Sequence, residues 1–151
     1  MYILNEVEYK EAWKNKTGEM EVIEYLPEGD DIENWEKMFS HHIMIGSNDN
    51  ITPLVEIVSM QVSSLESFLI AEPQVFNLDN SELLLLVSLK NESKKHIEIT
   101  SQRWFLNGDN IEFIQFAYAI PFQDYNEKWF EENDIFVTID KTNVDLIKLK
   151  I

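Results

Sequence analysis

Three histidines, His41, His42 and His96, are the side chains best suited to hold a metal ion or to transfer a proton near neutral pH. A zinc site needs converging ligands, such as two histidines four residues apart on a helix with a further carboxylate, or His-x-His on a strand. His41 and His42 are adjacent and would point to different faces of a helix, while His96 follows two lysines at the start of an expected strand. The spacing therefore predicts no metal site, and no motif indicates a cofactor.

Short motifs of common catalytic sites are absent from the sequence. There is no Gly-x-Ser-x-Gly, Walker loop, His-Glu-x-x-His or Gly-x-Gly-x-x-Gly, and four glycines are too few for a phosphate cradle. Adjacent acids such as Asp30-Asp31 or Glu131-Glu132 cannot flank one glycosidic bond. Because the chain has no cysteine, thiolate nucleophiles, disulfides and cysteine-based metal sites are excluded. We predict no catalytic residue and no enzyme activity.

Charge is distributed unevenly along the 151 residues. The chain has 28 acidic and 12 basic residues, a net charge of −16, which opposes binding to nucleic acid or to an anionic membrane. Residues 17–89 hold fourteen acidic residues and one basic residue, Lys37. An acidic face of this kind either steers a basic partner or only keeps the protein in solution. If it binds a partner, the predicted contact residues are Glu28, Asp30, Asp31, Glu33 and Glu36.

Length and composition predict one folded domain over residues 1–151, because 44% of the residues are hydrophobic and no linker is present. No segment approaches the roughly 20 apolar residues of a membrane-spanning helix, so we expect no membrane insertion. The first residues lack the basic and apolar regions of a signal peptide. As the sequence stands the protein is expected in the cytoplasm, or in the periplasm if a signal peptide has been removed.

The first half of the chain predicts a hairpin followed by two helices. Val7–Trp13 and Met20–Leu26 flank a Lys-Thr-Gly turn and indicate paired strands. A first helix is expected from a cap at Asp30 or Asp31, with Trp35 buried beneath the sheet. Its apolar stripe would be Ile32, Trp35, Phe39 and Ile43.

The second expected helix begins after a cap at Asn50 or Thr52, with Pro53 in its first turn, and ends before Pro73. Its apolar stripe would be Leu54, Ile57, Val58, Val62, Leu65, Phe68 and Leu69.

The second half predicts a sheet. Residues 83–89 form a continuous apolar run typical of a buried strand, and residues 96–105 and 111–120 indicate a hairpin around Asn107-Gly108-Asp109-Asn110. A short helix over residues 124–133 would bury Trp129 and Phe130, and residues 135–151 fit strands or a helix equally. The only arginine, Arg103, is expected in a structural ion pair.

Two segments resemble a known group of proteins. Residues 20–30, with Tyr25-Leu26-Pro27-Glu28-Gly29 at their centre, and residues 32–38, with Asn34-Trp35, resemble a strand–turn–helix pattern of small bacterial proteins with the PsbP/Mog1-type fold. Residues 114–119 are similar to a late strand of that group, although Ile120 replaces its usual basic residue. The resemblance implies an antiparallel sheet with helices on both sides, used for binding, and it implies no catalytic residue.

These observations predict an α+β fold, an antiparallel sheet with helices packed on its faces in an α/β/α sandwich. They favour a non-catalytic protein-binding module, of which an inhibitor or immunity protein that covers a basic toxin is one form. The alternative is a small-molecule or lipid-binding domain with an apolar pocket between sheet and helices.

Overall fold

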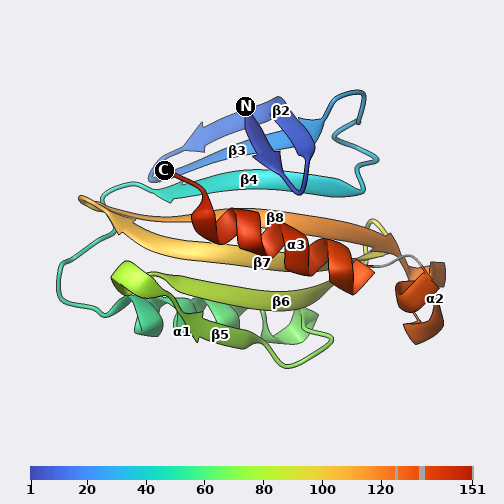
Figure 1. Ribbon diagram of the computed structural model, residues 1–151. Coiled ribbons are helices and arrows are strands. Elements are labelled where there is room, and N and C mark those ends of the chain that lie inside the picture. Colours follow the sequence, from blue (N-terminus) through green and yellow to red (C-terminus); the bar gives the residue numbers. More distant parts are fainter. Residues whose placement is uncertain (125, 133–134, 151) are drawn as a thin grey trace.

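A computed structural model describes residues 1–124, 126–132 and 135–150. It contains one eight-stranded antiparallel sheet in the order β1-β2-β3-β4-β8-β7-β6-β5 (Figure 1). The strands are β1 (Tyr2–Leu4), β2 (Val7–Thr17), β3 (Met20–Pro27), β4 (Lys37–Met44), β5 (Gln74–Asn77), β6 (Leu83–Asn91), β7 (His96–Asn107) and β8 (Asn110–Pro121). The helices are α1 (Leu54–Ser64), α2 (Glu127–Glu132) and α3 (Ile135–Lys148), with 3₁₀ turns η1 (Glu66–Phe68), η2 (Asp79–Ser81) and η3 (Phe122–Asp124).

Both predicted hairpins are confirmed. Strands β2 and β3 pair from Thr17 opposite Met20, and the turn between them contains Gly18 at a φ of +54°. Strands β7 and β8 pair from Asn107 opposite Asn110, around Gly108 at a φ of +58°. Since glycine adopts positive φ without steric cost, these two turns could be recognised in the sequence.

The helix predicted from Asp30 to Ile43 is wrong. Residues 28–36 form a loop, and β4 follows at Lys37, between β3 and β8. The side chains of Met38, Phe39 and Ser40 are all buried, so neighbouring positions on both faces of the strand are covered. An interior strand of this kind shows no apolar–polar alternation, and the spacing of its apolar residues in the sequence can resemble that of one face of a helix.

Helix α1 is confirmed, but it is shorter than expected. It ends at Ser64 and continues as η1, well before Pro73. Pro53, not Asn50 or Thr52, occupies the N-cap position, and no side chain caps the helix. Instead, a carboxylate oxygen of Asp49 accepts the backbone N–H groups of Ile51 and Thr52 at 2.9 and 2.8 Å.

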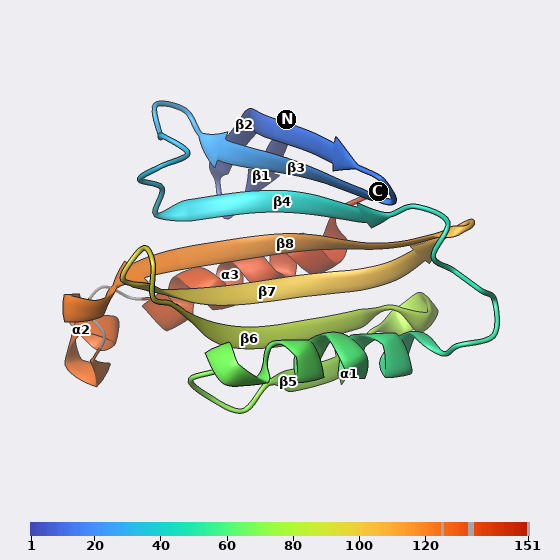
Figure 2. The same cartoon turned by 180° about the vertical axis from the view of Figure 1, so that it is seen from behind.

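Helices α1 and α3 lie on opposite sides of the sheet (Figures 1 and 2). Alternate residues of β8 face the two sides, so that Ile114 and Phe116 join the α3 cluster while Phe113 joins the α1 cluster. Within residues 135–151, which the sequence left open between strands and a helix, α3 spans Ile135–Lys148 and buries Ile135 and Leu146. Burial of Trp129 and Phe130 lies outside the described residues. No helix in the described parts of the chain is both long and apolar enough to span a bilayer.

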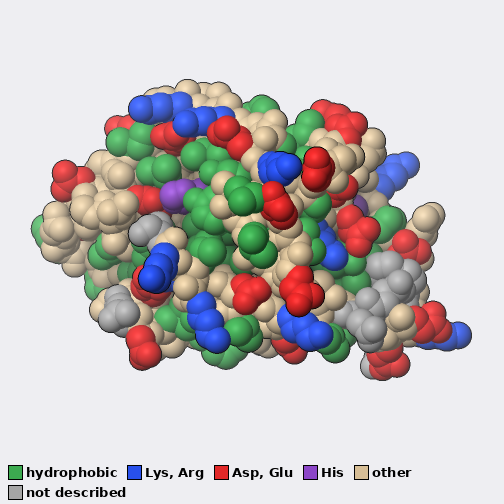
Figure 3. Space-filling view, turned by 45° about the horizontal axis from the view of Figure 1, so that its top comes forward, with side chains coloured by type: hydrophobic (Ala, Val, Ile, Leu, Met, Phe, Trp, Pro, Cys, Tyr) green, Lys and Arg blue, Asp and Glu red, His purple; other side chains and the backbone are tan. Residues whose placement is uncertain are grey.

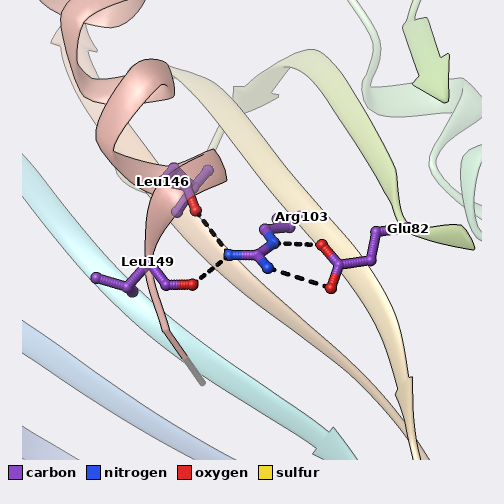
Figure 4. Close-up of polar contacts among 4 residues, drawn as sticks. All are labelled: Glu82, Arg103, Leu146 and Leu149. Atoms are coloured by element: carbon purple, nitrogen blue, oxygen red, sulfur yellow. Dashed lines mark hydrogen bonds and ion pairs between the residues drawn. The ribbon is translucent and has the colours of Figure 1, made fainter. Parts of the chain in front are cut away.

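Arg103 on β7 joins three elements (Figure 4). Its Nε and Nη2 donate to the two carboxylate oxygens of Glu82 at 2.6 and 3.1 Å. Its Nη1 donates to the backbone carbonyls of Leu146 and Leu149, at 3.1 and 2.6 Å, at the C-terminal end of α3. Carbonyls in the last turn of a helix have no partner within the helix, so the guanidinium serves as its cap. The ion pair predicted for Arg103 is confirmed, and the capping role is additional.

We expect Arg103→Met to lower the free energy of unfolding by about 3–5 kcal/mol, because it removes the cationic partner of the half-buried Glu82 carboxylate and the guanidinium donor of the Leu146 and Leu149 carbonyls. Denaturant unfolding measures the change. The matched control is Lys90→Met, whose ion pair with Glu92 joins side chains that are 44% and 67% exposed, so it should change the free energy by only about 0–1 kcal/mol. Equal effects of the two variants would contradict the capping role.

Candidate functional site: an acidic loop beside an open pocket

The loop between β3 and β4, residues 28–36, brings together the carboxylates predicted to contact a partner. All five residues are exposed, and they lie on one short segment at one end of the sheet. They are Glu28, Asp30, Asp31, Glu33 and Glu36. The structure therefore places the predicted residues on one exposed loop, and not at the start of a helix.

Hydrogen bonds within the loop and to β8 fix its path. Asp31 uses a carboxylate oxygen to accept the N–H of Glu33 at 3.0 Å and its backbone carbonyl to accept the N–H of Asn34 at 3.0 Å. Gly29 has a φ of +88°, which explains the glycine at this position. At the end of the loop, the carbonyl of Glu36 accepts the N–H of Ala119 at 2.8 Å.

Two of the five carboxylates have partners on neighbouring strands. Glu28 lies 3.5 Å from the Nζ of Lys10 in an exposed ion pair. Glu36 accepts the hydroxyl of Tyr118 at 2.6 Å, and burial, followed by this hydrogen bond, raises the pKa of Tyr118 well above its usual value. Among the described residues, no basic side chain forms an ion pair with the other three carboxylates.

A pocket of about 490 Å³ opens beside the loop, between it, the β6–β7 turn and the end of β8. Glu33 and Trp35 lie on the loop side, and Lys94 and Lys95 lie on the turn. The size falls in the range of small-molecule sites. The two lysines could not be assigned to this site from the sequence, because 57 or more residues separate them from the loop and only the strand order brings them near. Their one sequence signal is a lysine pair in the turn between two expected strands.

Trp35 is not buried beneath the sheet, as the helix interpretation required. It lies in the loop, is only partly buried, and contacts the edge of His96, with ring centroids 5.9 Å apart. The cost of about 3–5 kcal/mol for removing a fully buried tryptophan therefore applies to Trp104, which is 1% exposed, and not to Trp35.

Each histidine has its own partner. His41 Nε2 lies 2.6 Å from Glu112 Oε1, His96 Nε2 lies 2.8 Å from Glu98 Oε1, and His42 Nε2 lies 3.0 Å from Ser40 Oγ. Within the described residues, no three His, Cys, Asp or Glu side chains are grouped as metal ligands. His41 and His42 point to opposite faces of β4, as neighbours on a strand must.

Charges elsewhere are mixed. On the α3 side of the molecule, acidic and basic side chains are interspersed with hydrophobic ones (Figure 3). The loop differs because its carboxylates are consecutive or nearly so, and its positions 28–36 contain no basic residue. This loop and the adjacent pocket form the candidate site, which offers charge and aromatic surface for binding.

A protein-family model matches residues 4–132. The chain belongs to this family. The matched region contains the acidic loop, the pocket and seven complete strands of the sheet, and it ends before α3. No curated protein matches the chain. Among solved structures, that of the Ran-binding protein Mog1p of Saccharomyces cerevisiae is similar over 93% of this chain and 96% of that chain, with a TM-score of 0.48 and 9% identity. A PsbP/Mog1-type sandwich stays a prediction.

His42 gives the protein a specific acid sensitivity. Burial, and secondly the neighbouring His41, lower the pKa of His42 from 6.5 to about 4. Between these values the unfolded chain binds the proton more tightly than the folded protein, so stability falls as the pH drops from 6.5 towards 4. The slope for one proton is at most about 1.4 kcal/mol per pH unit. We expect a shallower decline for His42→Gln in denaturant unfolding over this range, and parallel curves would contradict the burial effect.

Proposed function

We propose that the chain is a non-catalytic protein-binding module that presents the loop of residues 28–36 to a basic partner protein, in the manner of an inhibitor or immunity protein. One observation carries the proposal: Asp30, Asp31 and Glu33 are exposed on a hydrogen-bonded loop and form no ion pair among the described residues. Carboxylates held close together repel one another, and a cationic surface would relieve that repulsion.

Order in the loop favours binding. The bonds of Asp31 to Glu33 and Asn34, and of Glu36 to β8, hold the backbone before any partner arrives. Less conformational entropy is then lost on association. The same carboxylates attract a basic surface over a distance of about 8 Å at physiological ionic strength, which increases the association rate.

The lysines across the pocket restrict how a partner can bind. Lys94 and Lys95 would repel cationic groups that approach from the side of the β6–β7 turn. A basic partner would therefore direct its cations to the loop and place neutral or acidic groups over the turn. This arrangement fixes orientation as well as affinity.

Packing gives less support to the alternative of a small-molecule or lipid pocket between sheet and helices. Buried side chains fill the space under α3, among them Ile135, Ile139 and Leu146, and those of Leu54 and Val58 fill the space under α1. The pocket beside the loop is open and carries both signs of charge. An apolar ligand would find more favourable surroundings in a closed apolar cavity.

The test is affinity capture of a partner, its identification by mass spectrometry, and kinetic binding measurements at two salt concentrations. We expect the variant Asp30→Lys, Asp31→Lys, Glu33→Lys to associate much more slowly than the wild type, and the association rate of the wild type to fall with salt. A second variant, Asp30→Asn, Asp31→Asn, Glu33→Gln, keeps a side-chain oxygen at position 31 for the loop hydrogen bond and should show the same trend.

The matched control reverses three exposed carboxylates on α1, η1 and α3, with Glu56→Lys, Glu66→Lys and Asp140→Lys. This control makes the same change in net charge as the loop variant with three lysines, but away from the loop. If the loop is the contact surface, the control should slow association far less. If the loop variant with three lysines and the control variant lose the same amount of association rate, only net charge matters. If neither loses affinity or salt dependence, this loop is not the binding surface, and the small-molecule alternative gains support.

A further inference from the structure

Strand β5 forms a free edge of the sheet. In the part of the chain that the structure describes, β5 pairs only with β6, and all four of its residues are exposed (Figure 1). The strand at the opposite edge, β1, is linked to α3, because Asn5 just after it donates its N–H to Asp145 Oδ2 at 2.6 Å. An edge strand carries N–H and C=O groups that can pair with a further strand.

The hydrogen bond next to β5 indicates which of its backbone groups face outward. Leu78 donates its N–H to the carbonyl of Glu82 at 2.8 Å, so residue 78 bonds toward β6. Residues in an antiparallel pair alternate between bonding inward and pointing outward. Phe76 therefore bonds to β6, while Val75 and Asn77 direct their N–H and C=O groups to solvent.

The protection of this edge against strand pairing is limited to its length of four residues and to Pro73, which lies just before it. Natural edge strands often contain lysine, proline or a bulge, whereas β5 reads Gln-Val-Phe-Asn and pairs with β6 in an unbroken register. Val75 and Phe76 are each 46% exposed and point to opposite faces of the sheet. A strand added here would cover apolar surface on both faces.

The charges that flank β5 indicate which kind of segment could pair with it. The exposed Glu72 and Asp79 lie just before and just after the strand, and residues 38–89 contain no lysine or arginine. The basic residues Arg103, Lys148 and Lys150 lie beside Glu82, and Arg103 already forms an ion pair with it. Pairing of two copies through β5 would bring like carboxylates together at its ends, which opposes self-association. A segment with lysine or arginine at both ends would instead meet opposite charges.

We propose that β5 is a docking edge on which an extended segment of a basic protein adds as a further strand. Main-chain hydrogen bonds form to Val75 and Asn77, apolar side chains of the segment cover Val75 and Phe76, and its flanking cations meet Glu72 and Asp79. The edge is separate from the loop of residues 28–36, which joins β3 and β4, so this inference goes beyond the proposed function.

The test uses a synthetic peptide with two lysines, four residues of alternating valine and threonine, and two further lysines. Calorimetry measures its affinity, and amide NMR shifts locate it. We expect the largest shifts at residues 74–77. Val75→Pro removes an outward N–H without removing a bond to β6, and should weaken binding by about tenfold. The matched control Val75→Thr keeps that N–H and should bind as the wild type does.

A peptide N-methylated on alternate residues provides the same test on the wild-type protein, whether or not Val75→Pro folds. It keeps its charges but loses main-chain donors, so the methylation pattern that faces β5 should also weaken binding. The variant Asp30→Lys, Asp31→Lys, Glu33→Lys should bind the unmodified peptide normally. Absence of binding, indifference to N-methylation, or loss of binding in that loop variant would overturn the proposal, and the last result would support the loop instead.

Discussion

The guanidinium of Arg103 is the interaction on which the arrangement of α3 depends. It is the only arginine of the chain, and it donates four hydrogen bonds, two to one carboxylate and two to helix-end carbonyls (Figure 4). The carboxylate precedes β6 and the carbonyls end α3, so one side chain on β7 ties the C-terminal end of the helix to the sheet, beside the bond from Asn5 to Asp145. The apolar cluster beneath α3, which includes Ile135 and Leu146, forms only when the helix lies in that position.

Basic side chains are scarce in this protein, and several of them form ion pairs with nearby carboxylates. Arg103 neutralises Glu82, and Lys10 and Lys14 pair with Glu28 and Glu21 across the β2–β3 hairpin. With 28 acidic residues and 12 basic ones, many carboxylates must remain unpaired. Those of the loop at residues 28–36 differ from the rest because hydrogen bonds hold them close together. Lys94 and Lys95 across the pocket limit the acidic region on one side.

Local chemistry explains which parts of the fold could be predicted from the sequence. Gly18 and Gly108 marked two hairpin turns, and the long stripe from Leu54 marked α1. Strand β4 was misread because its two buried faces leave no alternation, and Trp35 and Phe39 fell by chance at helical spacing. The acidic residues of the candidate site are close in sequence, so their clustering was predictable. The lysines opposite them were not, because strand order, and not sequence distance, places the β6–β7 turn beside the loop.

We infer that the loop of residues 28–36 holds carboxylates whose mutual repulsion is not compensated within the protein. The most direct measurement is the free energy of unfolding as a function of salt for the wild type and for Asp30→Asn, Asp31→Asn, Glu33→Gln. Salt screens repulsion, so added salt should stabilise the wild type, and the neutralised variant should be more stable at low salt and respond less to salt. An identical salt response of the two proteins would show that nearby lysines already compensate the loop, and it would contradict the account.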